Sequence, residues 1–137
     1  MTQETKTRDP RTLALAYVDA LAAQNYAALE ALLAPELRFR GPAMSRSTAA
    51  DFIAAVKRLG VIHLRSEVKR VFVDGQDVCV IYDFVTDTEA GTVPMIEWVT
   101  VAQDRIASIT LYYDRLPWQT VTAEMMARGA RTAAASA

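Results

Sequence analysis

Few side chains in this sequence are of the type that performs acid–base chemistry inside a protein. Asp83 lies in an apolar run that alternates as a β-strand does, with Ile81 before it and Val85 after it. If these side chains share an inward face, the Asp83 carboxyl loses hydration and can exchange protons near neutral pH. We therefore predict that Asp83 is a general acid or base. A hydrogen-bonded structural carboxylate and a residue on a dimer face are the alternatives.

His63 is the second candidate, because it is the only histidine of the chain. It follows Ile62 at the start of an expected strand and can titrate near neutrality if it faces a pocket. The alternative is a hydrogen-bonded or surface histidine without a catalytic role. One histidine and one cysteine, Cys79, are a poor ligand set, so we predict no metal site.

Three arginines, Arg38, Arg40 and Arg65, are candidates for binding an acidic substrate at the mouth of a pocket. Arg38 and Arg40 alternate with Leu37 and Phe39, which also fits a strand whose polar face is simply solvated.

Helical signals dominate the first 60 residues of the chain. Asp9 and Pro10 predict the start of a helix that reaches about Gln24, and Asn25 predicts the cap of a shorter second helix. Residues 37–40 predict a short strand, and Thr48 precedes a third helix that ends near residue 60.

From residue 61 the apolar period changes to two, which predicts strands at 62–73, 78–86, 92–102 and 106–114. A short helix at 118–128 completes a single domain of residues 1–128, and we expect a disordered tail at 129–137. We predict an α+β fold: a cone-shaped roll in which a curved, mostly antiparallel sheet wraps around the N-terminal helices and leaves an internal pocket.

Composition narrows the function classes. Of the 137 residues, 52% are hydrophobic and 23% are charged, and the net charge of −1 provides no basic surface for nucleic acid or anionic membranes. The sequence has no phosphate-binding glycine loop, and we expect no cofactor. We expect a cytoplasmic location.

The order of elements and several local runs resemble the nuclear transport factor 2-like superfamily. This superfamily includes ketosteroid isomerase, the SnoaL-like polyketide cyclases, scytalone dehydratase and limonene-epoxide hydrolase. The runs that carry the resemblance are Ala16-Tyr-Val-Asp-Ala-Leu21, Leu37-Arg-Phe-Arg-Gly-Pro42, Asp104-Arg-Ile106 and Leu111-Tyr-Tyr-Asp114. The resemblance implies the fold and a pocket, but not one reaction.

Similarity to the epoxide hydrolase implies that Val18 and Leu21 line the pocket, that Trp118 closes it, and that Asp83 matches a catalytic aspartate. The other polar positions of that enzyme's site are not retained, because this chain has Ile81, Leu111, Phe39 and Gly41 there. These residues cannot activate water, so we exclude epoxide hydrolysis by that mechanism. The general base of ketosteroid isomerase is also missing, because Gly41 and Pro42 follow the first strand.

If Asp83 faces inward, the alternation of side chains along each strand determines which residues of the neighbouring strands also face inward. The predicted substrate-binding residues are Tyr17, Val18, Leu21, Phe39, Ile81, Ile96, Trp98, Ile109, Leu111, Tyr113 and Trp118. The opposite rows, with Tyr82, Phe84, Glu97, Val99, Thr110 and Tyr112, are then outward and still largely apolar, which predicts a homodimer through the sheet face.

Two hypotheses about function follow. The first is a cofactor-free isomerase, cyclase, dehydratase or hydrolase that acts on a small hydrophobic molecule by proton transfer at Asp83. The second is a non-catalytic ligand-binding or dimeric accessory protein with the same pocket.

Overall fold

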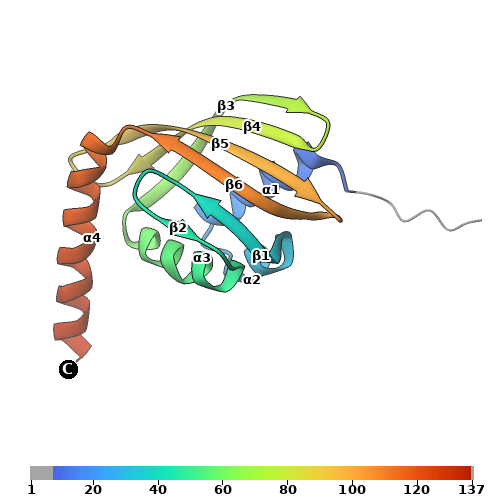
Figure 1. Ribbon diagram of the computed structural model, residues 1–137. Coiled ribbons are helices and arrows are strands. Elements are labelled where there is room, and N and C mark those ends of the chain that lie inside the picture. Colours follow the sequence, from blue (N-terminus) through green and yellow to red (C-terminus); the bar gives the residue numbers. More distant parts are fainter. Residues whose placement is uncertain (1–7, 137) are drawn as a thin grey trace, which may run out of the picture.

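The computed structural model describes residues 8–136, with side chains described through residue 131. These described residues form an α+β fold of four α-helices and one six-stranded sheet (Figure 1). The helices are α1 (Pro10–Ala22), α2 (Tyr26–Leu32), α3 (Ala49–Val56) and α4 (Arg115–Ser136), with a short 3-10 helix, η1 (Lys57–Val61). The strands are β1 (Leu33–Arg40), β2 (Ser45–Arg46), β3 (His63–Asp74), β4 (Asp77–Thr86), β5 (Thr92–Ala102) and β6 (Arg105–Tyr113).

The predicted helix starts are confirmed by side-chain caps. Asp9 accepts a hydrogen bond from the backbone N–H of Thr12 at 3.2 Å, and Asn25 accepts one from that of Ala28 at 3.1 Å. Thr48 caps α3 in the same way. Each cap satisfies a backbone donor that the first helical turn leaves without a partner.

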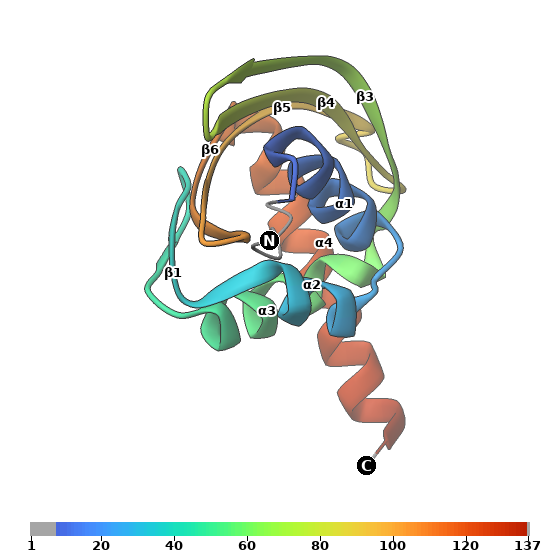
Figure 2. The ribbon, with the colours of Figure 1, turned by 90° about the vertical axis from the view of Figure 1, so that its right-hand side faces the viewer.

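The sheet has the strand order β2-β1-β6-β5-β4-β3. Neighbours are antiparallel except for β1 and β6, which are parallel. The long strands β3–β6 curve over α1, so this helix lies on the concave side (Figure 2). This arrangement confirms the predicted curved sheet around the N-terminal helices, although the sheet does not close on itself.

The chain differs from the expected element bounds at three places. β1 begins at Leu33, four residues earlier than expected, and the two-residue strand β2 was not expected. α4 begins at Arg115 and continues to Ser136, beyond the expected end at residue 128. Residue 137 lies outside the described residues.

The predicted facing of β4 and β5 is wrong. The buried row of β4 contains Val80, Tyr82 and Phe84, and that of β5 contains Met95 and Glu97. The residues expected to face inward therefore point to the convex face: Ile81, Asp83, Ile96 and Trp98, of which Ile96 and Trp98 are 38% and 47% exposed. Successive strand residues point to opposite faces, so a displacement of one residue inverts a whole row. On β6 the expected facing of Ile109 and Leu111 is correct.

Candidate functional site

A buried carboxylate on β5 is the chemical centre of the concave side. Glu97 is 1% exposed, and each of its oxygens accepts a hydrogen bond from a tyrosine hydroxyl. Tyr17 of α1 donates to Oε1 at 2.7 Å, and Tyr82 of β4 donates to Oε2 at 2.7 Å. Two elements far apart in sequence therefore converge on one acidic group, which satisfies both of its oxygens inside the core.

Burial governs the acidity of Glu97. Loss of hydration disfavours the carboxylate and raises the pKa of Glu97 to about 7, although the hydrogen bonds from Tyr82 and Tyr17 act in the opposite direction. At neutral pH both protonation states are therefore populated. A group with such a pKa can accept and release a proton without a large cost in either direction.

The two tyrosines keep their protons and act as donors. Burial raises the pKa of both hydroxyls well above 10, and the nearby Glu97 carboxylate raises it further. Tyr82 also contacts the sulfur of Met95 at 3.6 Å. Because Tyr17 and Tyr82 remain neutral, they can give hydrogen bonds either to Glu97 or to a polar atom placed beside them.

A cavity of about 290 Å³ adjoins this group. This volume is near the lower end of the range of about 300–1,000 Å³ that is usual for small-molecule pockets. The wall is mainly aromatic and aliphatic, and its residues include Tyr17, Leu21, Phe39, Met44, Phe52, Leu59, Tyr82, Phe84, Met95, Glu97, Leu111, Tyr113 and Trp118. The cavity would therefore suit a small, largely apolar molecule with a polar atom at the Glu97 end.

The turn after β1 approaches this cavity closely. Gly41 donates its N–H to the carbonyl of Met44 at 2.9 Å, which closes the turn between β1 and β2. A Cβ atom at position 41 would lie 3.3 Å from the ring of Phe39 and 3.7 Å from Cβ of Leu111. The absence of a side chain at Gly41 thus leaves room for two wall residues.

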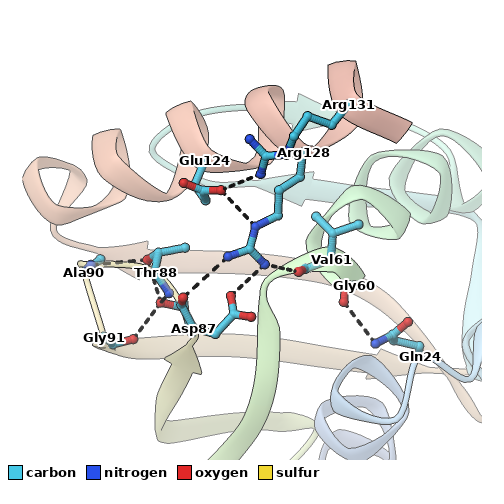
Figure 3. Close-up of polar contacts among 11 residues, drawn as sticks. Gln24, Gly60, Val61, Asp87, Thr88, Ala90, Gly91, Glu124, Arg128 and Arg131 are labelled. Atoms are coloured by element: carbon cyan, nitrogen blue, oxygen red, sulfur yellow. Dashed lines mark hydrogen bonds and ion pairs between the residues drawn. The ribbon is translucent and has the colours of Figure 1, made fainter. Parts of the chain in front are cut away.

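Helix α4 supplies the remaining wall with Trp118, Thr122 and Met125. Trp118 packs against Phe84 and Tyr113, with ring centroids 5.5 and 5.0 Å apart. Further along the helix, Arg128 donates to the carbonyl of Val61 at 2.6 Å and pairs with Asp87 at 2.8 Å (Figure 3). These contacts hold α4 against η1 and the loop that follows β4.

A second hollow of about 900 Å³ lies between α2, α3 and β1. It is larger than the first, but five of its eleven lining residues are alanines, and its ionisable residues Glu30, Lys57 and Arg105 are exposed. No buried polar group faces it among its lining residues. We therefore place the candidate site at Glu97.

Asp83 lies away from this site. It is on the convex face, opposite Glu67 of β3 in the strand register, and its carboxylate lies 3.5 Å from Nζ of Lys69. Asp83 thus has the environment of a partly exposed, paired carboxylate, and the prediction that it faces the pocket is wrong.

His63 is buried but lies outside the cavity wall. Its ring stacks on Phe84 with centroids 3.8 Å apart, and its Nε2 lies 3.0 Å from Oγ of Ser66. Burial lowers the pKa of His63 to about 4, so the ring is neutral at physiological pH. His63 therefore packs against the wall residue Phe84 without lining the cavity itself.

The other predicted substrate-binding residues divide into three groups. Six line the cavity: Tyr17, Leu21, Phe39, Leu111, Tyr113 and Trp118. Val18 and Ile109 are buried in the core without lining it. Ile81, Ile96 and Trp98 belong to the convex face. Of the three arginines, Arg38 and Arg40 are exposed and do not line the cavity, and Arg65 pairs with Glu67 at 2.6 Å.

Sequence reasoning missed Glu97 and Tyr82, the two polar site residues on the inverted rows, together with the wall residues Phe84 and Met95. The neighbours of Glu97 are the large apolar residues Ile96 and Trp98, so hydrophobicity alone favours an outward Glu97. The sequence nevertheless holds one sign of an inward Glu97: Met95, Val99 and Val101 are at every second position from it and so lie on the same face of the strand. That row is buried in the structure.

Two structural features commonly tied to function are absent from residues 8–136. No three histidine, cysteine, aspartate or glutamate side chains gather where a metal ion could bind. No described helix is long and apolar enough to cross a membrane.

Comparison with sequence families matches residues 14–109 to the SnoaL-like domain. No curated protein sequence is a significant match. Among solved structures, a protein from Kribbella flavida is 27% identical with a TM-score of 0.75, and the match covers 83% of this chain and 94% of that protein.

Two further structures share the fold at lower identity. A nuclear transport factor 2-like protein from Cytophaga hutchinsonii is 23% identical with a TM-score of 0.72, over 84% of this chain and 98% of that one. A candidate ketosteroid isomerase from Kribbella flavida is 20% identical with a TM-score of 0.67, over 77% of each chain.

The raised pKa of Glu97 makes a prediction about stability. The pKa rises from 4.5 in the unfolded chain to about 7 in the folded one, so the folded state binds more protons between these values. The free energy of unfolding of the wild type, minus that of Glu97→Gln, should therefore fall as pH rises from 4.5 to about 7, and stay level outside this window.

Urea unfolding of both proteins at a series of pH values measures this difference. His63, whose pKa is lowered, acts in the opposite direction, but it is common to both proteins and its contribution cancels. A difference in the free energy of unfolding that stays constant between pH 4.5 and 7 would contradict the raised pKa of Glu97.

Proposed function

We propose that this chain, which belongs to the SnoaL-like domain family, is an enzyme that transfers protons on a small, mainly hydrophobic molecule, with Glu97 as the general base and acid. The observation that carries the proposal is the position of Glu97. It is the only buried carboxylate among residues 8–136, and it lines the aromatic cavity.

The reaction that this arrangement supports best is proton removal from a carbon next to a carbonyl group. The Glu97 carboxylate takes the proton, and the electron pair of the C–H bond moves onto the carbonyl oxygen to give an enolate. If the proton on Glu97 is first replaced by one from solvent, its delivery to the same carbon completes an exchange of the α-hydrogen, and delivery to another carbon of the conjugated system isomerises the substrate. Both steps balance without a cofactor.

The tyrosines can follow the charge during this step. A carboxylate attracts both hydroxyl donors, whereas a protonated Glu97 attracts them less. When the proton moves to Glu97, the hydroxyl of Tyr17 or Tyr82 can turn its hydrogen bond to the new enolate oxygen. Neutral donors at a developing negative charge are a common source of rate enhancement in dry sites.

A non-catalytic ligand-binding protein is the second candidate function, and the apolar character of the cavity wall favours it. Such a protein would use the same pocket, with Glu97 and the two tyrosines as a hydrogen-bonding anchor. The two functions differ in whether a bound carbon acid loses its proton.

Exchange of α-hydrogens in D2O tests the proposal. β-Tetralone, a small apolar ketone with acidic α-hydrogens, should lose its α-proton NMR signal faster with the wild type than without protein. Glu97→Gln, which keeps the size of the side chain but can accept a hydrogen bond only at its amide oxygen, cannot take the proton and should reduce this rate by about 10²–10⁴-fold, the usual contribution of a general base.

Asp83→Asn is the matched control for this experiment, because Asp83 is a carboxylate on the opposite face of the same sheet. It should exchange the ketone as the wild type does. Equal rates in the wild type and Glu97→Gln would refute Glu97 as the base. Binding of the ketone without enhanced exchange would favour the non-catalytic function.

We also propose that two copies of this chain pair through the convex face of the sheet. Trp98 and Tyr112 are 47% and 52% exposed, and Phe72 of β3 is 58% exposed. The strand register aligns Phe72, Cys79 and Trp98 across three strands, so these side chains are neighbours. A self-complementary apolar face of this kind supports a symmetric dimer.

The indole of Trp98 is already fixed in place, because its Nε1 donates to Asp77 at 3.0 Å. Trp98→Glu should convert a dimer to a monomer in sedimentation equilibrium, since a charge would lie buried at the centre of the interface. Leu116→Glu, at an exposed apolar residue of α4, is the control and should remain dimeric. A wild-type chain that sediments as a monomer would contradict the proposal.

A further inference from the structure

Two arginine side chains belong to the wall of the Glu97 cavity. Arg46 lies on β2 and Arg58 on η1, and both line the cavity although neither is buried in the core. Arg58 is exposed and Arg46 is half-buried, whereas Glu97 at the other end is almost completely buried. A side chain that contacts both the cavity and solvent lies where the cavity opens, so the arginines mark its mouth.

The guanidinium groups of these arginines have N–H donors that are not used in ion pairs with carboxylates. Within residues 8–136, neither arginine forms an ion pair with a carboxylate. Arg46 donates one hydrogen bond to the carbonyl of Ser45 at 2.8 Å, which leaves most of its five N–H groups unused. By contrast, Arg65 and Arg128 have carboxylate partners.

Charge is thus segregated along the cavity. The acidic group is at the deep end, the cationic groups are at the mouth, and Phe39, Leu59 and Leu111 are among the apolar residues of the same wall. An anionic ligand group would be repelled by an ionised Glu97 and attracted by the arginines. It would therefore stay at the mouth while the apolar part of the ligand enters.

We propose that the ligand of this pocket is a small hydrophobic carboxylic acid, whose carboxylate is bound at the mouth by Arg46 and Arg58 while its apolar body extends toward Glu97. This inference rests on the proposed function for the identity of the reacting end, and it adds the class of substrate. A guanidinium group matches a carboxylate with two parallel hydrogen bonds, which also fixes the orientation of the ligand.

The acid-binding residues expected from sequence were Arg38, Arg40 and Arg65, and the structure brings different arginines to the cavity. Arg38 remains useful as a control, because it has the same charge but lies on the solvated face of β1, outside the cavity wall. Removal of its charge changes the net charge of the protein to the same extent as removal of Arg46 or Arg58.

Binding of 3-phenylpropanoate and of its neutral amide, 3-phenylpropanamide, tests the proposal by NMR titration at low salt. The two probes have the same size and differ only in the charged group. The wild type should bind the acid more tightly than the amide. Arg46→Gln should weaken binding of the acid by about 10-fold and Arg58→Gln by about 3-fold, the larger effect belonging to the less exposed side chain.

Both variants should bind the amide as the wild type does, and Arg38→Gln should keep the full preference for the acid. Equal affinity of the wild type for acid and amide, equal behaviour of Arg46→Gln and Arg38→Gln, or binding of neither probe would overturn the proposal. Urea unfolding midpoints of the variants show whether each one is folded.

Glu97→Gln separates this inference from the proposed function. Its effect is at the deep end, so it should keep the preference for the acid while it loses ketone exchange. If the wild type prefers the acid but ketone exchange does not depend on Glu97, the ligand class is supported and the reaction is refuted. If ketone exchange depends on Glu97 but the acid is not preferred, the reaction is supported and the ligand class is refuted.

Discussion

The site depends on the requirement that a carboxylate inside the core find hydrogen-bond donors. Glu97 meets this requirement with one hydroxyl from α1 and one from β4, each 2.7 Å from a different oxygen. An unpaired buried carboxylate would cost several kcal/mol, so these contacts fix the position of α1 on the sheet and the register of β4 against β5. The geometry that stabilises the fold therefore also holds an acid–base group ready beside a cavity.

The remaining features of the cavity follow from the curvature of the sheet. Strands β3–β6 bend over α1, and α4 returns across one end of the molecule, where Trp118 packs on Phe84 and Tyr113 (Figures 1 and 2). The result is a hollow with a buried polar end and an opening bordered by arginines. This separation of charge would orient a bound ligand in the cavity. A fixed orientation would allow a single proton-transfer group to act on one particular carbon.

Local sequence signals predicted the fold class, the four α-helices and the longer strands of the described residues, but not β2 or the full length of α4. Caps at Asp9, Asn25 and Thr48 are short-range features that the chain satisfies where the sequence predicts them. For the facing of β4 and β5 the local signals conflict, although the apolar row of Met95, Val99 and Val101 indicates the correct side of β5. Both rows of β4 contain large apolar residues, and in β5 the exposed row contains Trp98 while the buried row contains Glu97. The tyrosines that make Glu97 tolerable in the core are 80 and 15 residues away, and no local pattern records such contacts.

The account depends most on the acidity of Glu97, and the carboxyl carbon of this residue reports it directly. Carbon-13 NMR titration of the protein, with the Glu97 resonance assigned by its absence from Glu97→Gln, should show an apparent pKa of about 7. A Glu97 that titrates near 4.5, as a solvated glutamate does, would show that the carboxylate is not held in a dry site and would contradict its role as a proton-transfer group at neutral pH.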